Sequence, residues 1–284
     1  MAEPVPAMNA TEDEVLQRWC RAPALGEAPC VLAVVAHPDD EVLGFGGRMG
    51  HVAAQLHVAY VSDGAPDDER FYRPLGFEHR ADYAAARRAE ARRGLALAGL
   101  PESQTHELGV VDQHVSSCLE RVVEWLLPLI TRVAPDAVLT HAYEGGHPDH
   151  DATACAVHVA LHRLGFGQGR FRPLWEFASY HARGAELVRG QFIADPACPE
   201  HHIQLDAATR ALKLRLLECH ATQREFLWTF PVDTETFRVA PEHDFSKPPA
   251  APFFYDRMDW GVSGGAFLLA ARRLQHAYGV SVPC

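Results

Sequence analysis

The hydrophobic positions of the chain fall into short apolar runs that alternate with longer segments in which apolar residues recur every three or four positions. Short apolar runs are typical of strands buried on both faces, and the longer periodic segments are typical of amphipathic helices. The runs predict strands over residues 31–36, 56–62, 105–109, 135–140, 174–181 and 202–205. The periodic segments predict helices over residues 11–20, 41–55, 82–100, 116–133, 149–164 and 207–220.

The order of these segments predicts the fold class. Strands that alternate with helices form right-handed βαβ units, which build a mostly parallel sheet with helices on both faces. We therefore expect an α/β, Rossmann-like, doubly wound fold. The alternation stops after residue 165, and residues 233–254 are rich in proline and aromatic residues and are expected to be irregular. We expect an N-terminal extension over 1–28 and a single domain over 29–284, with an elaborated C-terminal half.

Composition and charge exclude several classes of protein. The chain has 284 residues and a formal net charge of −11, which argues against general binding of nucleic acid because phosphate affinity comes from clustered cations. No stretch approaches the ~18 apolar residues of a membrane-spanning helix, and residues 1–28 do not resemble a signal peptide. Seven dispersed cysteines without a CxxC pair indicate reduced thiols. These features predict a cytoplasmic protein without membrane insertion.

Two polar clusters follow apolar strands. Residues 37–41 (HPDDE) end the first predicted strand, and residues 147–150 (HPDH) follow a later one. Ligands of open α/β sheets bind at the carboxyl ends of parallel strands, so both clusters are expected at one edge of the sheet. Three carboxylates and a histidine are costly to hold together unless a cation joins them. Catalytic zinc commonly has two histidines and one carboxylate as ligands, with one position open to water.

The spacing within the clusters suggests which residues bind the metal and which acts as a base. His37 and Asp40 could bind one metal ion together with a histidine of the second cluster. Asp39 is then the carboxylate left to act as a base. An isolated HxxD pattern is as typical of a capping aspartate beside a surface histidine, but two such clusters at two strand ends favour a metal site. Glu41 is assigned to the helix dipole and not to the metal.

The string AHPDDE after the first strand, with HPDH after a later one, resembles the PIG-L/LmbE-like de-N-acetylases. This family contains zinc hydrolases of N-acetylglucosaminyl-inositol compounds, chitooligosaccharides and antibiotics. The resemblance covers roughly residues 31–164 and implies zinc ligands at His37, Asp40 and His150. It also implies that Asp39 is the general base for a zinc-activated water.

The resemblance implies roles for four further residues. His147 would protonate the leaving amine or stabilise the oxyanion, and Asp149 would orient the His147 imidazole. Arg87, in an R-x-x-E pattern with Glu90, would contact the sugar, although an i,i+3 surface salt bridge is the simpler explanation. Asp112 would contact sugar hydroxyls, or it would merely cap the following helix.

The chain departs from the family pattern near the second cluster. Some relatives carry a mobile tyrosine where this chain has Gly145, and whether Tyr143 or Glu144 replaces it is open. The loop over 65–78 and the segment over 245–260 are expected to frame the acceptor side of the pocket and to determine specificity. Two histidines are expected to be structural or to lie around the site, namely His141 and His220.

The resemblance implies a metal-dependent hydrolase of EC 3.5.1 type, which removes an N-acetyl group from an N-acetylglucosamine-containing small molecule or glycoconjugate. Zinc is the expected metal, but Fe²⁺ or Co²⁺ could occupy the same ligands, and relatives often form trimers or hexamers. One alternative is an amidase that cleaves a larger acyl group from a thiol-sugar conjugate or an acylated glycopeptide. A remote alternative is a Rossmann-like nucleotide-binding protein that uses Gly44, Gly46 and Gly47, but the neighbouring anionic turn would repel phosphate.

Overall fold

A seven-stranded sheet forms the centre of the computed structural model, which describes residues 11–21, 28–165 and 173–280. The strand order is β3-β2-β1-β4-β5-β9-β8. The first five of these strands are parallel to one another, and β9 and β8 continue the sheet in antiparallel pairing. In this order, the strands span Thr105–Val110, Leu56–Ser62, Val31–Val35, Ala137–His141, Leu174–Phe177, Thr234–Val239 and Glu200–Gln204.

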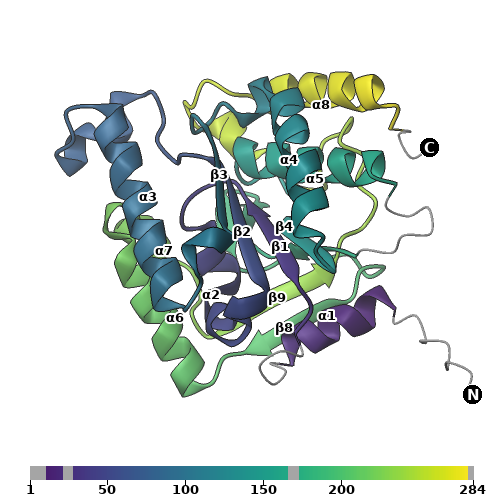
Figure 1. Cartoon of the computed structure of the whole chain (residues 1–284). Coiled ribbons are helices and arrows are strands. Elements are labelled where there is room, and N and C mark those ends of the chain that lie inside the picture. Colours follow the sequence, from purple (N-terminus) through teal and green to yellow (C-terminus); the bar gives the residue numbers. More distant parts are fainter. Residues whose placement is uncertain (1–10, 22–27, 166–172, 281–284) are drawn as a thin grey trace, which may run out of the picture.

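Helices cover both faces of this sheet, which confirms the predicted α/β fold (Figure 1). Alternate residues of β1 point to opposite faces: Leu32 and Val34 pack with α4, α5 and α8, whereas Val31 and Val35 pack with α1, α2, α3 and α6. These helices and α7 span Glu12–Cys20 (α1), Asp40–Val52 (α2), Arg80–Leu97 (α3), Leu119–Val133 (α4), Pro148–Arg163 (α5), Ala207–Cys219 (α6), Arg224–Leu227 (α7) and Gly264–Tyr278 (α8).

The described part of the N-terminal extension packs on the main core. Thr11 caps α1 in a capping box with Glu14, and Leu16 and Trp19 are fully buried. The helix contacts β8 and β9, at the antiparallel end of the sheet. Residues 1–10 and 22–27 of the predicted extension lie outside the described residues, so the boundary at residue 28 stays a prediction.

Two expectations for the C-terminal half are wrong. The strand predicted over 174–181 is two strands, because the chain leaves the sheet after β5 and continues as β6 (Tyr180–Arg183), which forms a hairpin with β7 (Glu186–Arg189). The region over 233–254 is not irregular throughout, since it contains β9. Polar residues of β9 are buried with partners from neighbouring elements, such as Glu235 with Lys213. Because of these polar residues, the sequence of β9 contains no apolar run that would predict a strand.

Close packing brings α2 against the sheet at the point where the site forms. A Cβ atom at Gly44 would overlap the ring of Phe177 on β5. Glycine at this position therefore allows the helix that follows HPDDE to lie directly on the strand ends. None of the described helices is both long and apolar enough to cross a membrane.

Candidate active site

The two polar clusters lie together at the carboxyl edge of the sheet. The first forms the turn between β1 and α2, and the second forms the turn between β4 and α5. β1 and β4 are paired neighbours, and the strand order reverses between them (Figure 1). Such a switch point is where open α/β sheets bind ligands. The expectation that the clusters share one edge is confirmed.

Asp40 lies between the two histidines predicted to share a metal with it. Its Oδ2 atom is 3.3 Å from His37 Nδ1, and its Oδ1 atom is 3.1 Å from His150 Nε2. The backbone N–H of His37 donates to the same Oδ2 at 2.7 Å, which fixes the carboxylate in the turn. His147 joins them, because its ring centroid is 4.5 Å from that of His37. The structure therefore brings all three predicted ligands into one buried cluster.

The charge of this cluster suits a divalent cation. Four aspartates that are at most 6% exposed gather around it: Asp39, Asp40, Asp112 and Asp149. Asp112 Oδ1 lies 3.1 Å and Asp149 Oδ2 lies 3.4 Å from His37 Nε2. Burial lowers the pKa of His37, but these carboxylates raise it well above its usual 6.5. An excess of buried negative charge is costly without a cation, and imidazole and carboxylate are zinc ligands.

His141 supports the cluster from behind. Its ring stacks on that of His150 with a centroid distance of 3.9 Å and an interplanar angle of 12°. Its Nε2 atom accepts a hydrogen bond of 2.9 Å from the backbone N–H of Ala36, so the lone pair nearest to Asp40 is already used. Burial, followed by His150, lowers the pKa of His141 to about 3, which keeps the ring neutral. These contacts make His141 a packing and orienting residue.

Asp39 occupies a strained position next to the cluster. Its φ of 143° lies in the region that residues other than glycine rarely adopt. The backbone N–H of Asp39 donates to Glu41 Oε2 at 3.0 Å, and its side-chain Oδ2 accepts from Arg87 at 2.7 Å. Burial raises the pKa of Asp39 to about 7, although Arg87 lowers it. A carboxylate with a pKa near neutrality is suited to taking a proton from a reacting group.

Arg87 has a different position from the one the resemblance implies. Its side chain is 5% exposed and donates to the backbone oxygens of Gly64 and Pro38 as well as to Asp39. The guanidinium therefore holds the base and the turn that carries it, and its expected contact with the sugar stays a prediction. Glu90 does not pair with Arg87 either, because its carboxylate accepts from the backbone N–H and the hydroxyl of Thr222 at 3.0 and 2.6 Å.

The predicted role of the Asp149 carboxylate is also corrected. Its two oxygens accept from the backbone N–H groups of Gln113 and Val115 at 2.7 and 3.1 Å. It is the backbone N–H of Asp149 that orients His147, by donating to Nδ1 at 3.1 Å. Because Nδ1 accepts, the proton of the neutral ring is on Nε2, which lies 3.8 Å from Asp112 Oδ1.

Glu41 was missed as a residue of the site. It lies in the first turn of α2, where a carboxylate favours the helix dipole as expected, but it is also fully buried and its Oε2 holds the backbone of Asp39. Its Oε1 lies 3.7 Å from Nε2 of His220, which is also fully buried. Burial raises the pKa of Glu41 to about 8. The signal that could have found it is its place in the string HPDDE, directly after the strained turn.

Aromatic side chains from the predicted 245–260 segment and from β6 border the cluster. The ring centroid of Trp260 is 4.9 Å from that of His147, and the centroid of Tyr180 is 5.2 Å from that of His150. The loop over 65–78 joins this border, because Arg70 donates to the backbone oxygen of Asp259 at 2.9 Å. The expectation that this loop and the 245–260 segment lie beside the site is therefore confirmed, whereas their role in specificity stays a prediction.

Neither residue considered as a substitute for the family's mobile tyrosine is free to act as one. The hydroxyl of Tyr143 donates to the backbone oxygen of Lys247 at 2.7 Å. The carboxylate of Glu144 accepts from the backbone N–H of Ile193 at 2.6 Å. Both side chains thus point into the C-terminal segments and away from the histidine cluster.

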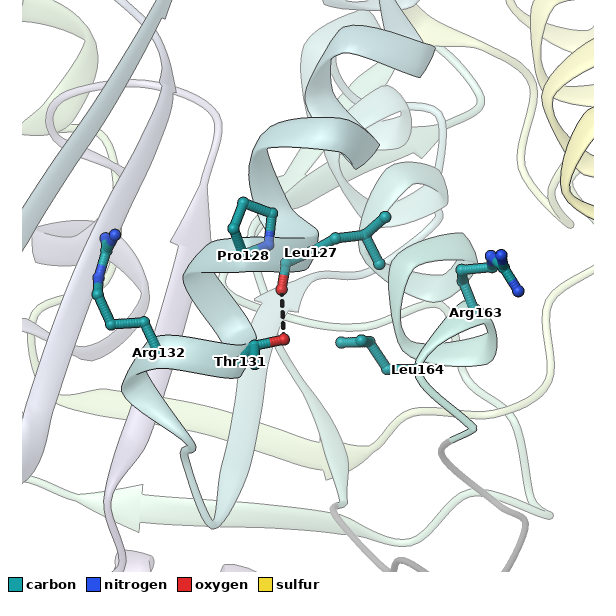
Figure 2. Close-up of a pocket in the computed structure, with 6 residues that line it drawn as sticks. All are labelled: Leu127, Pro128, Thr131, Arg132, Arg163 and Leu164. Carbon is teal, nitrogen blue, oxygen red and sulfur yellow. Dashed lines mark hydrogen bonds between the residues drawn. The ribbon is translucent and has the colours of Figure 1, made fainter.

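A separate groove of about 630 Å³ lies at the opposite end of α5. It is lined by residues of α4 and by the end of α5, including Arg163 (Figure 2). His150 lies in the first turn of α5, and a helix rises ~1.5 Å per residue, so the groove is roughly 20 Å from the histidine cluster. It takes no part in the candidate active site.

Comparison with known proteins agrees with this site. Residues 32–161 match the family model described as PIG-L, GlcNAc-PI de-N-acetylase. One similar relative is 1D-myo-inositol 2-acetamido-2-deoxy-alpha-D-glucopyranoside deacetylase of Mycolicibacterium smegmatis, which is 31% identical over 187 residues. That match covers 57% of this chain and 63% of the relative, so the chain spans less than two thirds of the length of this relative.

Solved structures share the fold at lower identity. The A40926 pseudoaglycone deacetylase Dbv21 superposes with a TM-score of 0.56 at 20% identity, over 75% of this chain and 99% of that one. The zinc-inhibited form of teicoplanin deacetylase Orf2 gives 0.55 at 17% identity, over 73% and 96%. The 4-carboxy-2-hydroxymuconate hydratase GalB from Pseudomonas putida gives 0.50 at 18% identity, over 75% and 97%, so the fold alone does not select amide hydrolysis.

The family match is more specific than the fold. Residues 32–161 include both motifs, HPDDE and HPDH, and therefore all the site residues that these motifs supply. The resemblance predicted from AHPDDE and HPDH is confirmed, because residues 32–161 match the PIG-L family model.

Proposed function

We propose that this protein is a metal-dependent hydrolase that removes an N-acetyl group from an N-acetylglucosamine-containing small molecule or glycoconjugate. The observation that carries the proposal is the position of Asp39, a buried carboxylate with a pKa of about 7 beside a histidine–aspartate donor set. The name of the family matched by residues 32–161 and the names of the curated relatives support the choice of substrate class.

The residues proposed to hold the metal are His37, Asp40 and His150. Two imidazoles and one carboxylate are typical of catalytic zinc sites, and we propose Zn²⁺, with Fe²⁺ or Co²⁺ as the metals that the same donors would accept. A bound divalent cation would polarise the amide carbonyl and lower the pKa of a water. The excess of buried carboxylates around His37 supports the presence of such a cation.

The chain itself supplies the proton transfers. Asp39 takes a proton from the water whose oxygen adds to the acyl carbon, and Arg87 keeps the Asp39 carboxylate in place during that step. The Nε2–H of neutral His147 can donate to the oxyanion that develops on the acyl oxygen. When the C–N bond breaks, the amine takes the proton that Asp39 removed. The products are acetate and the free amino sugar.

The acyl group is the part of the proposal on which the alternatives differ. An amidase for larger acyl groups would use the same Asp39 and His147, so these residues do not separate the two functions. The rings of Trp260 and Tyr180 next to the histidines are suited to stacking on a sugar or on an apolar acyl chain. We rank the acetyl group first because the matched family acts on N-acetylglucosamine.

The test is an amine-release screen on the metal-free protein supplied with Zn²⁺, Co²⁺ or Fe²⁺. The substrates are free N-acetylglucosamine and its inositol, oligosaccharide and glycopeptide conjugates, each with acetyl and with longer acyl groups. We expect metal-dependent release from at least one acetylated conjugate. His150→Ala should abolish it, and His162→Ala, an exposed histidine on the same helix, should not. Release only from long acyl groups would favour the amidase, and full activity of His150→Ala would contradict the proposed site.

A further inference from the structure

A second group of metal-type side chains lies away from the candidate active site. His158 of α5, Glu176 of β5 and His243, which follows β9, have ligand atoms that all lie within 4.8 Å of one another. His158 follows His150 by eight residues on α5, which places it ~12 Å further along the helix. The two groups therefore share a helix but no residue.

The carboxylate of this second cluster has one oxygen fixed and the other directed at a histidine. Glu176 is fully buried, and its Oε2 accepts from Arg238 Nε at 2.7 Å. Its Oε1 lies 2.5 Å from His243 Nε2. A ligating carboxylate is commonly held in this way, by a hydrogen bond to the oxygen that does not face the metal.

His158 completes the cluster with an unused nitrogen. Its Nε2 atom is buried and has no hydrogen-bond partner among the described residues. Leaving a buried polar atom unpaired costs ~1–3 kcal/mol. The ring centroid of His158 is 5.3 Å from that of His243, at an interplanar angle of 66°. The unused Nε2 is one of the two ring nitrogens that His158 can offer to the group formed with Glu176 and His243, and a metal ion bound there would give it a partner.

A cavity gives this cluster a route to solvent. The cavity has a volume of about 380 Å³ and is lined by His243 together with Tyr143, Glu144, Asp244 and Lys247. A metal bound by three protein side chains needs such an opening for its entry and for a fourth ligand such as water. His243 lines the cavity and contacts Glu176, so an ion that enters through the cavity meets this cluster first at His243.

We propose that His158, Glu176 and His243 form a second divalent-metal site, distinct from the catalytic cluster. Two imidazoles and one carboxylate select Zn²⁺ or a similar transition ion over Mg²⁺ or Ca²⁺. Binding displaces the proton shared by His243 and Glu176 to solvent. The ion joins α5, which carries His150 in its first turn, to β5 and to the segment after β9. The site is weaker than the catalytic one, because Arg238 already neutralises Glu176.

The experiment separates the two sites by substitution in the full-length protein. Chelator-treated protein is titrated with Co²⁺ and with Zn²⁺, and bound metal is measured by elemental analysis and, for Co²⁺, by its visible absorption. We expect two equivalents in the unsubstituted protein and one in His150→Ala. We expect none in His150→Ala combined with His158→Phe, a change that keeps a flat ring but removes both nitrogens.

A second variant and a stability measurement distinguish loss of metal binding from loss of folding. In the His150→Ala background, His243→Gln should weaken the remaining equivalent at least tenfold, and His162→Phe, an exposed control on the same helix, should not. Added Zn²⁺ should raise the melting temperature of His150→Ala, raise it less in the double variant with His243→Gln, and leave it unchanged in the double variant with His158→Phe, since a ligand stabilises a protein in proportion to how tightly it binds. A His150→Ala protein that binds no metal, or binds it equally after either second substitution, overturns the proposal. Neither outcome depends on the deacetylase activity.

Discussion

The two histidine clusters of α5 differ in how their charge is balanced. Around His37 and His150 lie four buried aspartates and the guanidinium of Arg87, which is 2.7 Å from Asp39 and 3.9 Å from Asp112. In the second cluster, one glutamate faces Arg238 at 2.7 Å, so the charges are nearly equal without a metal. The two clusters have similar ligand types, but they should differ in metal affinity. A cation is expected to bind tightly at the strand ends and weakly at the second cluster, two turns further along α5. The surrounding charge, more than the ligands themselves, sets how tightly each cluster holds an ion.

The sharpest test of this comparison is Asp39→Asn, which removes one negative charge but keeps an oxygen that can accept from Arg87. If Asp39 is the base and not a ligand, metal content should be unchanged while kcat falls by ~10²–10⁴, the range that general bases contribute. Elemental analysis and amine release on the same preparation measure both. Asp82→Asn, an exposed aspartate in the first turn of α3, is the matched control. Loss of the metal together with activity would make Asp39 part of the metal site and contradict the division of roles.

A smaller effect is expected at Glu41, the buried carboxylate below the strained turn. Glu41→Ala removes the acceptor for the Asp39 N–H, and an unpaired buried donor costs ~1–3 kcal/mol. We expect kcat to fall by roughly tenfold or more with little change in KM, since the turn that aims the base loosens while the pocket walls stay in place. Kinetics at saturating metal separate the two constants.

Glu41→Gln sharpens the same test, because the amide oxygen replaces the carboxylate oxygen as the acceptor. Burial raises the pKa of Glu41 to about 8, so at pH 7 the native side chain is largely neutral and glutamine resembles it closely. Activity within about twofold of the unsubstituted protein is expected from this similarity. If Glu41→Gln lowered activity as much as Glu41→Ala does, activity would require a negative charge on Glu41. Glu41 would then have to be counted with the four aspartates among the negative charges around the catalytic cluster.

The sequence predicted the catalytic cluster because its parts are local. HPDDE and HPDH each follow an apolar strand, and parallel strands bring such turns to one edge, so His37, Asp40 and His150 could be grouped without knowing any long-range contact. The same reasoning predicted a strand at six of the seven positions in the sheet, although the run at β5 was extended too far, into β6, and β9 was missed.

The errors arise where a side chain's partner lies far along the chain. The contacts of Arg87 with Gly64 and Asp39 were not predicted, because they depend on how α3 crosses the turn after β1. β9 was missed because Arg238 is buried against Glu176, which no periodicity reports. The second cluster was not predicted at all, since its members come from three elements and form no motif.

The smallest expected effect concerns His220, which lies beneath the catalytic cluster and has no carboxylate within hydrogen-bonding distance among the described residues. Burial, followed by Arg87 and Arg93, lowers the pKa of His220 to about 3 in the folded protein. Since an unfolded histidine has a pKa near 6.5, the unfolded state binds the extra proton between these values, and stability falls as the pH drops below 6.5. This residue alone contributes a slope of at most about 1.4 kcal/mol per pH unit over that window.

His220→Gln should remove that slope while keeping a polar side chain of similar size. In metal-free protein, denaturant unfolding at pH 7.0, 6.0 and 5.0 should therefore show a smaller loss of stability for the variant than for the unsubstituted chain. His51→Gln, at an exposed histidine of α2, is the matched control. Equal slopes for His220→Gln and the unsubstituted protein would mean that His220 gains a proton without cost in the folded state. Ionised Glu41, 3.7 Å away, would then be the negative partner of the protonated His220 ring, and the catalytic cluster would extend one layer deeper than the comparison with the second cluster assumes.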